Sequence, residues 1–444
     1  MYSEAIENAL GANGIKIGDS IRLKTTNGDF EGTLMPRPEA GDAGILILKL
    51  KSGYNIGVKY APSAHIEKLS SPTETFSFPE AKTTAKRSLE DVTMLYTGGT
   101  IGSKVDYVTG GVHMLTKASE LLYDVPELAD IANIEARDLM HIASEDISYV
   151  EWQQIAAATA DAFKRGARGV IITMGTDMMH YTAAALSFML KNLPGPVAIT
   201  GAQRSSDRGS SDAFMNLICS AYVAAKSNIG EVGTCMHEKS SDDSCAFING
   251  TKVRKMHTSR RDAFRPVNGS ATARVSYNGK IEYLSAYRKA DATTDKISAE
   301  TKFEPRVALV KIYPNSDPGI LDYYLNKGYK GIILEGTGLG HAPVSTPHKE
   351  YNWLEEIKRA CNSGVVVGMT SQCLYGRVHP MVYRNLRLIH DAGAVYCEDM
   401  LPEVAYVKLG WLLGNHDRDY SMEWLGRNMA GEITPRTEFE WFDA

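Results

Sequence analysis

Hydrophobic and polar positions follow two different patterns along the chain, and the change between them falls near residue 90. In the first part, short apolar runs are separated by tight turns, and Asn27-Gly28 is a strong two-residue hairpin signal. This pattern predicts a small N-terminal β-barrel over residues 1–70, with strands at 17–24, 29–34, 45–50 and 54–58. Residues 71–90 are rich in Ser, Thr, Pro and charged residues, and they are expected to form a linker.

From residue 91 the pattern changes to buried-type strands that end in glycine turns, followed by segments with apolar residues at helical spacing. This alternation predicts an α/β fold with a doubly wound parallel sheet. We expect the domain built on this sheet to span residues 91–286. A polar connection at 287–304 and a smaller C-terminal α/β domain over 305–444 are expected to follow it.

Composition narrows the class of protein. With 444 residues, 43% of them hydrophobic and 23% charged, the chain is expected to be a globular protein of two or three domains. It has no apolar run near twenty residues and no secretory signal, so a cytoplasmic location without membrane association is expected. The six cysteines form no C-x-x-C pair, which favours reduced core thiols over disulfides or a metal site.

Hydroxyl groups follow two of the buried-type strands. Residues 92–103 read VTMLYTGGTIGS and place Thr100 after a glycine pair, and residues 169–177 read GVIITMGTD and end in Thr176 and Asp177. An ordinary helix-capping threonine is the simpler interpretation of each turn alone. A threonine becomes a nucleophile when a base removes its proton, and Lys255, in the segment VRKMHT, can supply an amine. Without further context Lys255 would be taken as a surface cation.

Other classes of protein fit the motifs less well. TGGTIGS is not the G-x-G-x-x-G of a dinucleotide-binding fold, and no Walker pattern is present. The G-x-S-x-G of a serine hydrolase is absent, and His237-Glu238 lacks the second histidine of a zinc hydrolase. A non-catalytic binding protein would not need the hydroxyls, Asp177 and Lys255 together.

The segments TGGTIGS, IASEDI, TMGTDMMHYTA and VRKMHTSRRDAF, in this order, closely resemble those of type I L-asparaginases and their glutaminase relatives, from about residue 91 to 414. The resemblance implies that both threonines face the substrate amide, and we favour Thr100 for the attack. It further implies that Tyr107 is the activating tyrosine and that Lys255 is the catalytic partner of Thr176, with Asp177 beside it to tune the proton affinity of the amine. Asp177, Ser144 and Glu145 would hold the amino-acid head group. The chain departs from the asparaginase pattern at two points. Asparaginases usually carry glutamine at the position of Glu145. They also receive an acidic residue in the site from a neighbouring subunit, and no counterpart of it is evident in this sequence, where Tyr383 and Arg377 give no sign of such a role.

Several stretches resemble a narrower family, the D subunits of the archaeal glutamyl-tRNA(Gln) amidotransferases: GAQRSSDRGSSDAFMNL, RKMHTSRRDAFR, TSQCLYGRV and CEDMLPEVAYVKLGW. This implies a subunit that releases ammonia from glutamine, or from asparagine, and has no cofactor of its own. A partner, the amidotransferase E subunit, would use ATP and Mg to amidate glutamate on tRNA(Gln), and the chain would also form a homodimer. The alternative is a free-standing asparaginase or glutaminase with an added N-terminal domain.

The charge of the chain bears on the role of tRNA. Its net charge is -5, whereas nucleic-acid binding normally leaves a basic footprint. The only local concentration of basic residues is a cluster of Lys and Arg over 252–265. We interpret this cluster as a solvated or subunit-facing surface rather than as a site that contacts phosphate groups. We therefore expect the partner to hold most of the tRNA.

Overall fold

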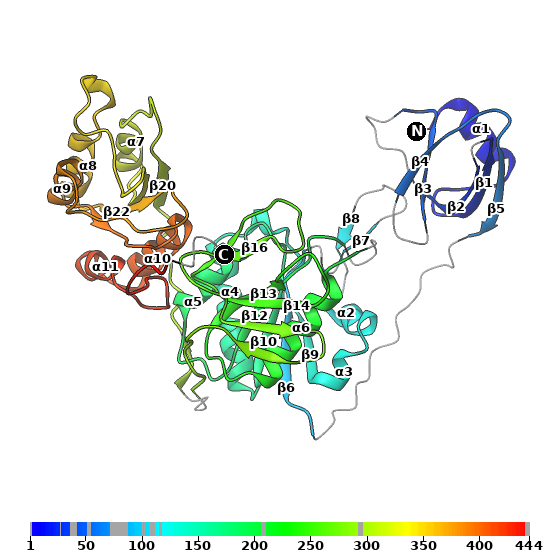
Figure 1. The fold of residues 1–444 in the computed structure, drawn as a ribbon, viewed down its shortest axis with the longest axis horizontal. Coiled ribbons are helices and arrows are strands. Elements are labelled where there is room, and N and C mark those ends of the chain that lie inside the picture. Colours follow the sequence, from blue (N-terminus) through cyan, green and yellow to red (C-terminus); the bar gives the residue numbers. More distant parts are fainter. Residues whose placement is uncertain are drawn as a thin grey trace.

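The computed structural model of the chain gathers its helices and strands into three parts (Figure 1). The residues that it describes are 2–26, 28–35, 42–50, 55–71, 88–99, 101, 103–105, 112–114, 118–205, 210–291 and 296–439. Within these ranges, no helix combines the length and the apolar composition needed to cross a membrane.

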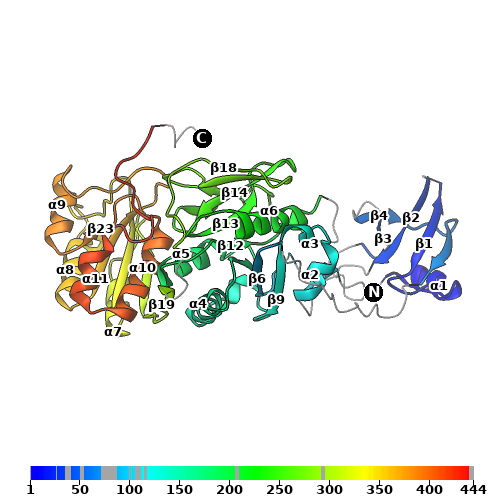
Figure 2. The ribbon, with the colours of Figure 1, turned by 90° about the horizontal axis from the view of Figure 1, so that it is seen from below.

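The N-terminal part is an antiparallel sheet of five strands in the order β4-β3-β2-β1-β5, and it lies at one end of the molecule (Figure 2). Ile21 and Leu23 of β1 are buried together with Ile6 and Leu10 of α1, so this part has its own small core, consistent with the expected β-barrel. The elements are α1 (Glu4–Ala12), β1 (Ser20–Thr25), β2 (Gly28–Met35), β3 (Ile45–Lys49), β4 (Asn55–Lys59) and β5 (His65–Ser70).

Strand β5 was missed by the strand pattern. Only Ile66 of its six residues is buried, so the segment shows no alternation of apolar and polar positions. The hairpin expected at Asn27-Gly28 joins β1 to β2, with Thr25 opposite Gly28, while Asn27 itself lies outside the described residues. Most of the expected linker, residues 72–87, also lies outside them.

The central part is built on an eight-stranded sheet with the order β18-β17-β14-β13-β12-β10-β6-β9. The strands from β9 to β13 are parallel, which confirms the α/β fold, and β14, β17 and β18 add an antiparallel edge that the sequence pattern did not predict. The strands are β6 (Asp91–Tyr96), β9 (Asn133–Asp138), β10 (Gly169–Thr173), β12 (Val197–Thr200), β13 (Val232–His237), β14 (Ser244–Asn249), β17 (Ala273–Ser276) and β18 (Ile281–Tyr283).

Helices cover both faces of this sheet. Successive side chains of a strand point to opposite faces, so a strand of apolar residues such as β10 offers apolar side chains to helices on each side. Val170 and Ile172 of β10 belong to the apolar cluster that contains α4 and α5, whereas Ile171 belongs to the cluster that contains α2, α3 and α6. The helices are α2 (Ala118–Asp124), α3 (Leu128–Ile131), α4 (Tyr149–Lys164), α5 (Met179–Met189) and α6 (Ala213–Lys226). Three short strand pairs complete this part: β7 (Ser103–Val105) with β8 (Val112–Met114), β11 (Leu190–Lys191) with β19 (Ser298–Ala299), and β15 (Val253–Lys255) with β16 (Phe264–Pro266).

The C-terminal part is a parallel four-stranded sheet with the order β20-β21-β22-β23. Helices α7, α8 and α9 pack on one face, and α10 and α11 pack on the other. The elements are β20 (Val307–Lys311), α7 (Ile320–Asn326), β21 (Gly331–Gly336), α8 (Leu354–Asn362), β22 (Val366–Ser371), α9 (Arg384–Asp391), β23 (Val395–Tyr396), α10 (Pro402–Asn415) and α11 (Arg418–Leu425). The domain boundaries proposed from the sequence stay predictions.

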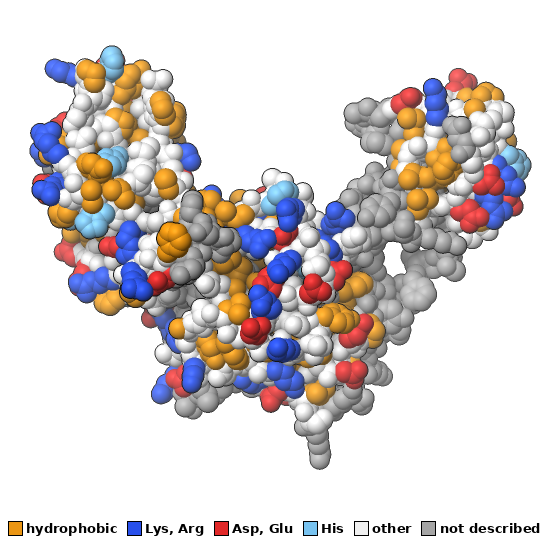
Figure 3. Space-filling view, viewed as in Figure 1, with side chains coloured by type: hydrophobic (Ala, Val, Ile, Leu, Met, Phe, Trp, Pro, Cys, Tyr) orange, Lys and Arg blue, Asp and Glu red, His pale blue; other side chains and the backbone are white. Residues whose placement is uncertain are grey.

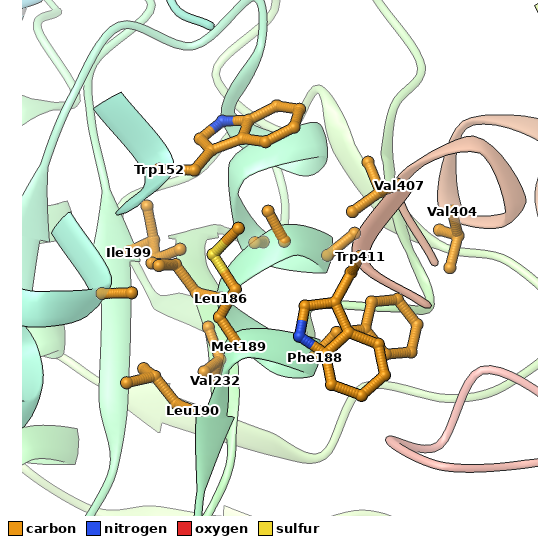
Figure 4. Close-up of a cluster of buried hydrophobic side chains, with 14 of the residues drawn as sticks. Trp152, Leu186, Phe188, Met189, Leu190, Ile199, Val232, Val404, Val407 and Trp411 are labelled. Atoms are coloured by element: carbon orange, nitrogen blue, oxygen red, sulfur yellow. The ribbon is translucent and has the colours of Figure 1, made fainter. Parts of the chain in front are cut away.

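Helix α10 joins the C-terminal part to the central one. Figure 4 shows Trp411, Val407 and Val404 of α10 beside α5, and the ring of Trp411 stacks on that of Phe188 with 6.1 Å between ring centroids. Both aromatic side chains are buried. Since α5 begins three residues after Thr176, this contact anchors the helix that follows one of the predicted threonines.

Candidate active site

The turns after β6 and β10 lie against each other. Tyr96 pairs with Thr173 in the parallel sheet, and Thr97 donates hydrogen bonds to the Thr173 carbonyl from its backbone nitrogen and from Oγ1, at 3.0 and 2.9 Å. Gly99 has φ +88°, and a Cβ on it would lie 2.2 Å from the backbone nitrogen of Gly175. Two glycines therefore allow the turn that precedes Thr100 to contact the turn that carries Thr176.

Lys255 reaches this point from β15. Its Nζ donates to Thr176 Oγ1 at 2.8 Å and to Asp177 Oδ1 at 2.7 Å. The Lys255 side chain is 10% exposed and the Asp177 side chain is 62% exposed, while Thr176 is buried. Because Lys255 donates to Thr176 Oγ1 and is itself held by Asp177, the amine restrains the orientation of the threonine hydroxyl. The open carboxylate of Asp177 is left accessible to a substrate.

Ser144 and Glu145 lie in a short 3-10 helix, Ser144–Asp146. Ser144 is buried, and its Oγ accepts a hydrogen bond from the backbone nitrogen of Asp177 at 3.2 Å. A Cβ on Gly175 would lie 2.7 Å from the same Oγ, so this serine packs directly on the Thr176 turn. The side chain of Glu145 is exposed, and no hydrogen bond or ion pair joins it to another described residue. The structure thus brings Ser144, Thr176, Asp177 and Lys255 together, and Glu145, next to Ser144 in the chain, has an exposed side chain.

Thr100 and Tyr107 lie outside the described residues. Gly99 and Ile101, which flank Thr100, are described, and Ile101 is fully buried. The roles assigned to Thr100 and Tyr107 stay predictions.

His180, in the first turn of α5, is a residue of this neighbourhood to which the sequence assigned no role. Burial and, to a smaller extent, the positive charges of Arg254 and Lys255 lower the pKa of His180 to about 4, against an opposing effect of Asp177. Its Nδ1 is buried and has no hydrogen-bond partner among the described residues. The imidazole is therefore neutral at pH 7. Nothing in the spacing of TMGTDMMHYTA separates this histidine from an ordinary helical one.

The basic cluster of residues 252–265 is largely paired with acidic groups. Lys252 Nζ lies 2.8 Å from Asp399 Oδ2, and both side chains are buried. The guanidinium groups of Arg260 and Arg265 bind Asp262, and that of Arg261 binds Asp242. On the face that Figure 3 shows, Lys and Arg are interspersed with Asp and Glu over the central part. Lys252 thus belongs to the interior, whereas Arg260 and Arg265 are exposed, and for these two the interpretation as a solvated or subunit-facing surface stays a prediction.

In the described part of the chain, no group of three or more His, Cys, Asp or Glu side chains could hold a metal ion. All six cysteines are free thiols. Four of them are buried, as expected for core thiols, whereas Cys361 is half-buried and Cys373 is exposed.

Comparison with known proteins agrees with this fold and site. Residues 91–288 match the family model "Asparaginase, N-terminal", and residues 306–423 match "Glutaminase/Asparaginase C-terminal domain". The solved thermostable L-asparaginase from Thermococcus kodakarensis has a TM-score of 0.68 at 30% identity, covering 78% of this chain and 99% of that one. L-asparaginase I from Vibrio cholerae gives 0.68 at 27% identity with the same coverage. The central and C-terminal parts therefore have the asparaginase fold.

The N-terminal part identifies a narrower family. Residues 15–69 match the model "GatD N-terminal domain". The D subunit of glutamyl-tRNA(Gln) amidotransferase from Pyrococcus furiosus is 47% identical over 442 residues, covering 98% of each chain, and that from Methanopyrus kandleri is 46% identical over 445 residues, covering 97% of this chain and 94% of the relative. The chain belongs to the family of glutamyl-tRNA(Gln) amidotransferase D subunits, the GatD family.

Proposed function

We propose that this chain is the glutaminase subunit of a tRNA-dependent amidotransferase: it releases ammonia from glutamine, and a partner, the amidotransferase E subunit, uses this ammonia with ATP to convert Glu-tRNA(Gln) to Gln-tRNA(Gln). The observation that carries the proposal is the contact of Lys255 Nζ with both Thr176 Oγ1 and Asp177 Oδ1, in a chain that matches a GatD relative over 98% of its length. A hydroxyl held by an amine beside an accessible carboxylate suits the hydrolysis of an amino-acid amide.

In the proposed reaction, the hydroxyl oxygen of Thr100 loses its proton and attacks the side-chain carbonyl carbon of glutamine, with Tyr107 as the activating group. The carbon–nitrogen bond then breaks, and the leaving nitrogen takes up a proton and departs as ammonia. Water hydrolyses the threonine ester and releases glutamate. Thr176 and Lys255 move the protons that these steps require, because the 2.8 Å contact makes a direct proton transfer between them possible.

The head group of the substrate is assigned to Asp177, Ser144 and Glu145. The exposed carboxylate of Asp177 can bind the α-ammonium of glutamine as an ion pair. Ser144 keeps Asp177 in place through the bond between its Oγ and the Asp177 backbone, and its hydroxyl hydrogen is left for the substrate carboxylate. Glu145, next to Ser144 in the chain, is assigned a part in the attraction for the ammonium.

The assembly follows from the same assignment. We infer a cytoplasmic complex in which two copies of this chain form a homodimer with two copies of the E-type partner. The partner binds ATP and Mg, and because the basic cluster of this chain is paired with carboxylates, the partner also holds most of the glutamylated tRNA.

The test compares hydrolysis of glutamine and asparagine by the purified chain with hydrolysis by the complete complex, with and without Glu-tRNA(Gln) and ATP. Glutamine hydrolysis should be slow in the isolated chain and should accelerate when the partner and the charged tRNA are added, since induced assembly of a catalytic site restricts its turnover. Exogenous ammonium should restore amidation in variants of Thr176 or Lys255. Full-speed hydrolysis by the chain alone, or failure of ammonium to rescue, would favour a free-standing asparaginase or glutaminase.

A further inference from the structure

Strand β15, which carries Lys255, has a second charged residue that contacts the C-terminal part of the chain. Arg254 directly precedes Lys255, and its Nη1 lies 3.5 Å from Oε2 of Glu403. The Arg254 side chain is 33% exposed, whereas that of Glu403 is 4% exposed. Because neighbouring side chains of a strand point to opposite sides, Arg254 can bind α10 while Lys255 faces Thr176.

Glu403 sits in an unusual place for a carboxyl group. It is the second residue of α10, where the partial positive charge of a helix start favours an anion, but it is buried and its Oε1 has no hydrogen-bond partner among the described residues. Burial raises the pKa of Glu403, and the charge of Arg254 opposes this shift. The charge of Glu335 in β21 adds to the rise in the pKa of Glu403. Burial together with the charge of Glu403 raises the pKa of Tyr181 in α5 to about 12. Among the described residues, a backbone hydrogen bond at the helix start and the charge of Arg254 are what favour the buried carboxylate, so it depends strongly on Arg254.

Helix α10 therefore contacts both segments that carry the reactive pair. It holds α5, which follows Thr176, through the stacking of Trp411 on Phe188. It holds β15, which carries Lys255, through the Arg254–Glu403 ion pair. We propose that Glu403 is a positioning residue of the amide-hydrolysis site, which acts through Arg254 and the backbone of β15 to set Lys255 Nζ against Thr176 Oγ1. The inference rests on the proposed function of this site.

The test is Glu403→Gln in the complete amidotransferase complex. This change keeps the shape of the side chain and removes the anion that holds Arg254. We expect kcat for glutamine hydrolysis to fall by about 10- to 100-fold with KM nearly unchanged, since displacement of a reacting group by about 1 Å can cost about 100-fold in rate. Arg254→Gln should give the same loss, and the double variant should be no worse than either single one, because both act through one contact. Arg254 is partly exposed, so its variants carry the test if Glu403→Gln does not fold.

Glu432→Gln is the matched control. Glu432 is also fully buried and binds α10, through Lys408 Nζ at 2.6 Å, and its other hydrogen bonds are to the backbone of Met429 and Ala430 rather than to β15. It should lower stability and leave kcat of the folded protein at the wild-type value. If Glu432→Gln lowered kcat as much as Glu403→Gln, the loss would follow from the removal of any buried carboxylate near α10, and the proposal would be overturned.

A crystal structure of Glu403→Gln separates this inference from the proposed function. The Lys255 Nζ–Thr176 Oγ1 distance, 2.8 Å here, should lengthen in the variant. An unchanged distance or an unchanged kcat would overturn the positioning role. A wild-type complex without glutaminase activity would instead overturn the proposed function, and the distance would still test the role of Glu403.

Discussion

Lys255 and Thr176 lie 79 residues apart in the sequence, and yet the Nζ of the lysine donates a 2.8 Å hydrogen bond to the Oγ1 of the threonine. The contact joins a short antiparallel strand pair to the carboxyl end of the parallel sheet. A threonine and a lysine have no special reactivity when they lie apart, but here the amine of the lysine holds the hydroxyl of the threonine.

Removal of either member should abolish most amide hydrolysis. We expect Thr176→Ala and Lys255→Ala, and likewise Thr100→Ala, to lower kcat by about 10³-fold or more, the scale seen when a nucleophile or its base is lost. Steady-state assay of ammonia release measures this, and circular dichroism should show an intact fold. Thr176→Ser, which keeps the hydroxyl, should retain far more activity. Near-normal hydrolysis by the double variant Thr100→Ala/Thr176→Ala would contradict the assignment.

The two carboxylates near the site should differ in importance. Asp177→Ala should raise KM for glutamine and lower kcat, because the substrate ammonium loses its charged partner, at a cost of about 2–5 kcal/mol. Glu145→Gln should have a milder effect, since Glu145 is exposed and its amide replacement still offers an oxygen acceptor. The same assay, run over a range of glutamine concentrations, compares the two variants. If Glu145→Gln proved as damaging as Asp177→Ala, Glu145 would have a catalytic or structural role beyond substrate binding.

The contact between the two glycine turns should tolerate no side chain. Gly99→Ala would place a Cβ 2.2 Å from the backbone nitrogen of Gly175, at φ +88°, so we expect loss of activity together with a lower thermal midpoint. Gly166→Ala is the control, because its φ is +98° but no atom lies within 4 Å of the added Cβ. This control should cost about 1–2 kcal/mol for the left-handed backbone alone and leave kcat unchanged. Equal kcat in the two variants would show that the close approach of the turns is not needed.

His180 should make stability depend on pH. Its pKa is about 4 in the folded protein, below the usual 6.5, so between these values the unfolded chain binds more protons and stability falls as the pH falls. From pH 7.5 to pH 5 the loss attributable to His180 should be about 2 kcal/mol. Urea unfolding of the wild type and of His180→Gln at the two pH values measures this. The variant should lose less stability on acidification, and an identical loss in both proteins would contradict the buried neutral imidazole.

The sequence by itself determined the local features of this protein. Apolar runs that end in glycine predicted β6 and β10, because strand periodicity and turn chemistry depend on a few neighbouring residues. The same segments drew attention to Thr176, Asp177 and Lys255, and their order carried the resemblance to asparaginases. Strand β5 escaped this reasoning, since its stability comes from pairing with β1 rather than from an apolar face of its own.

Only the tertiary structure decided which of these residues meet. No spacing rule places Lys255 on Thr176, and none links Arg254 to Glu403, which lies 149 residues further along the chain. These contacts depend on how β15 and α10 pack against α5, and packing is a property of surfaces that distant segments form together. Burial then changed the chemistry of single groups: the low pKa of His180 and the raised pKa of Glu403 arise from desolvation, which a linear sequence does not express.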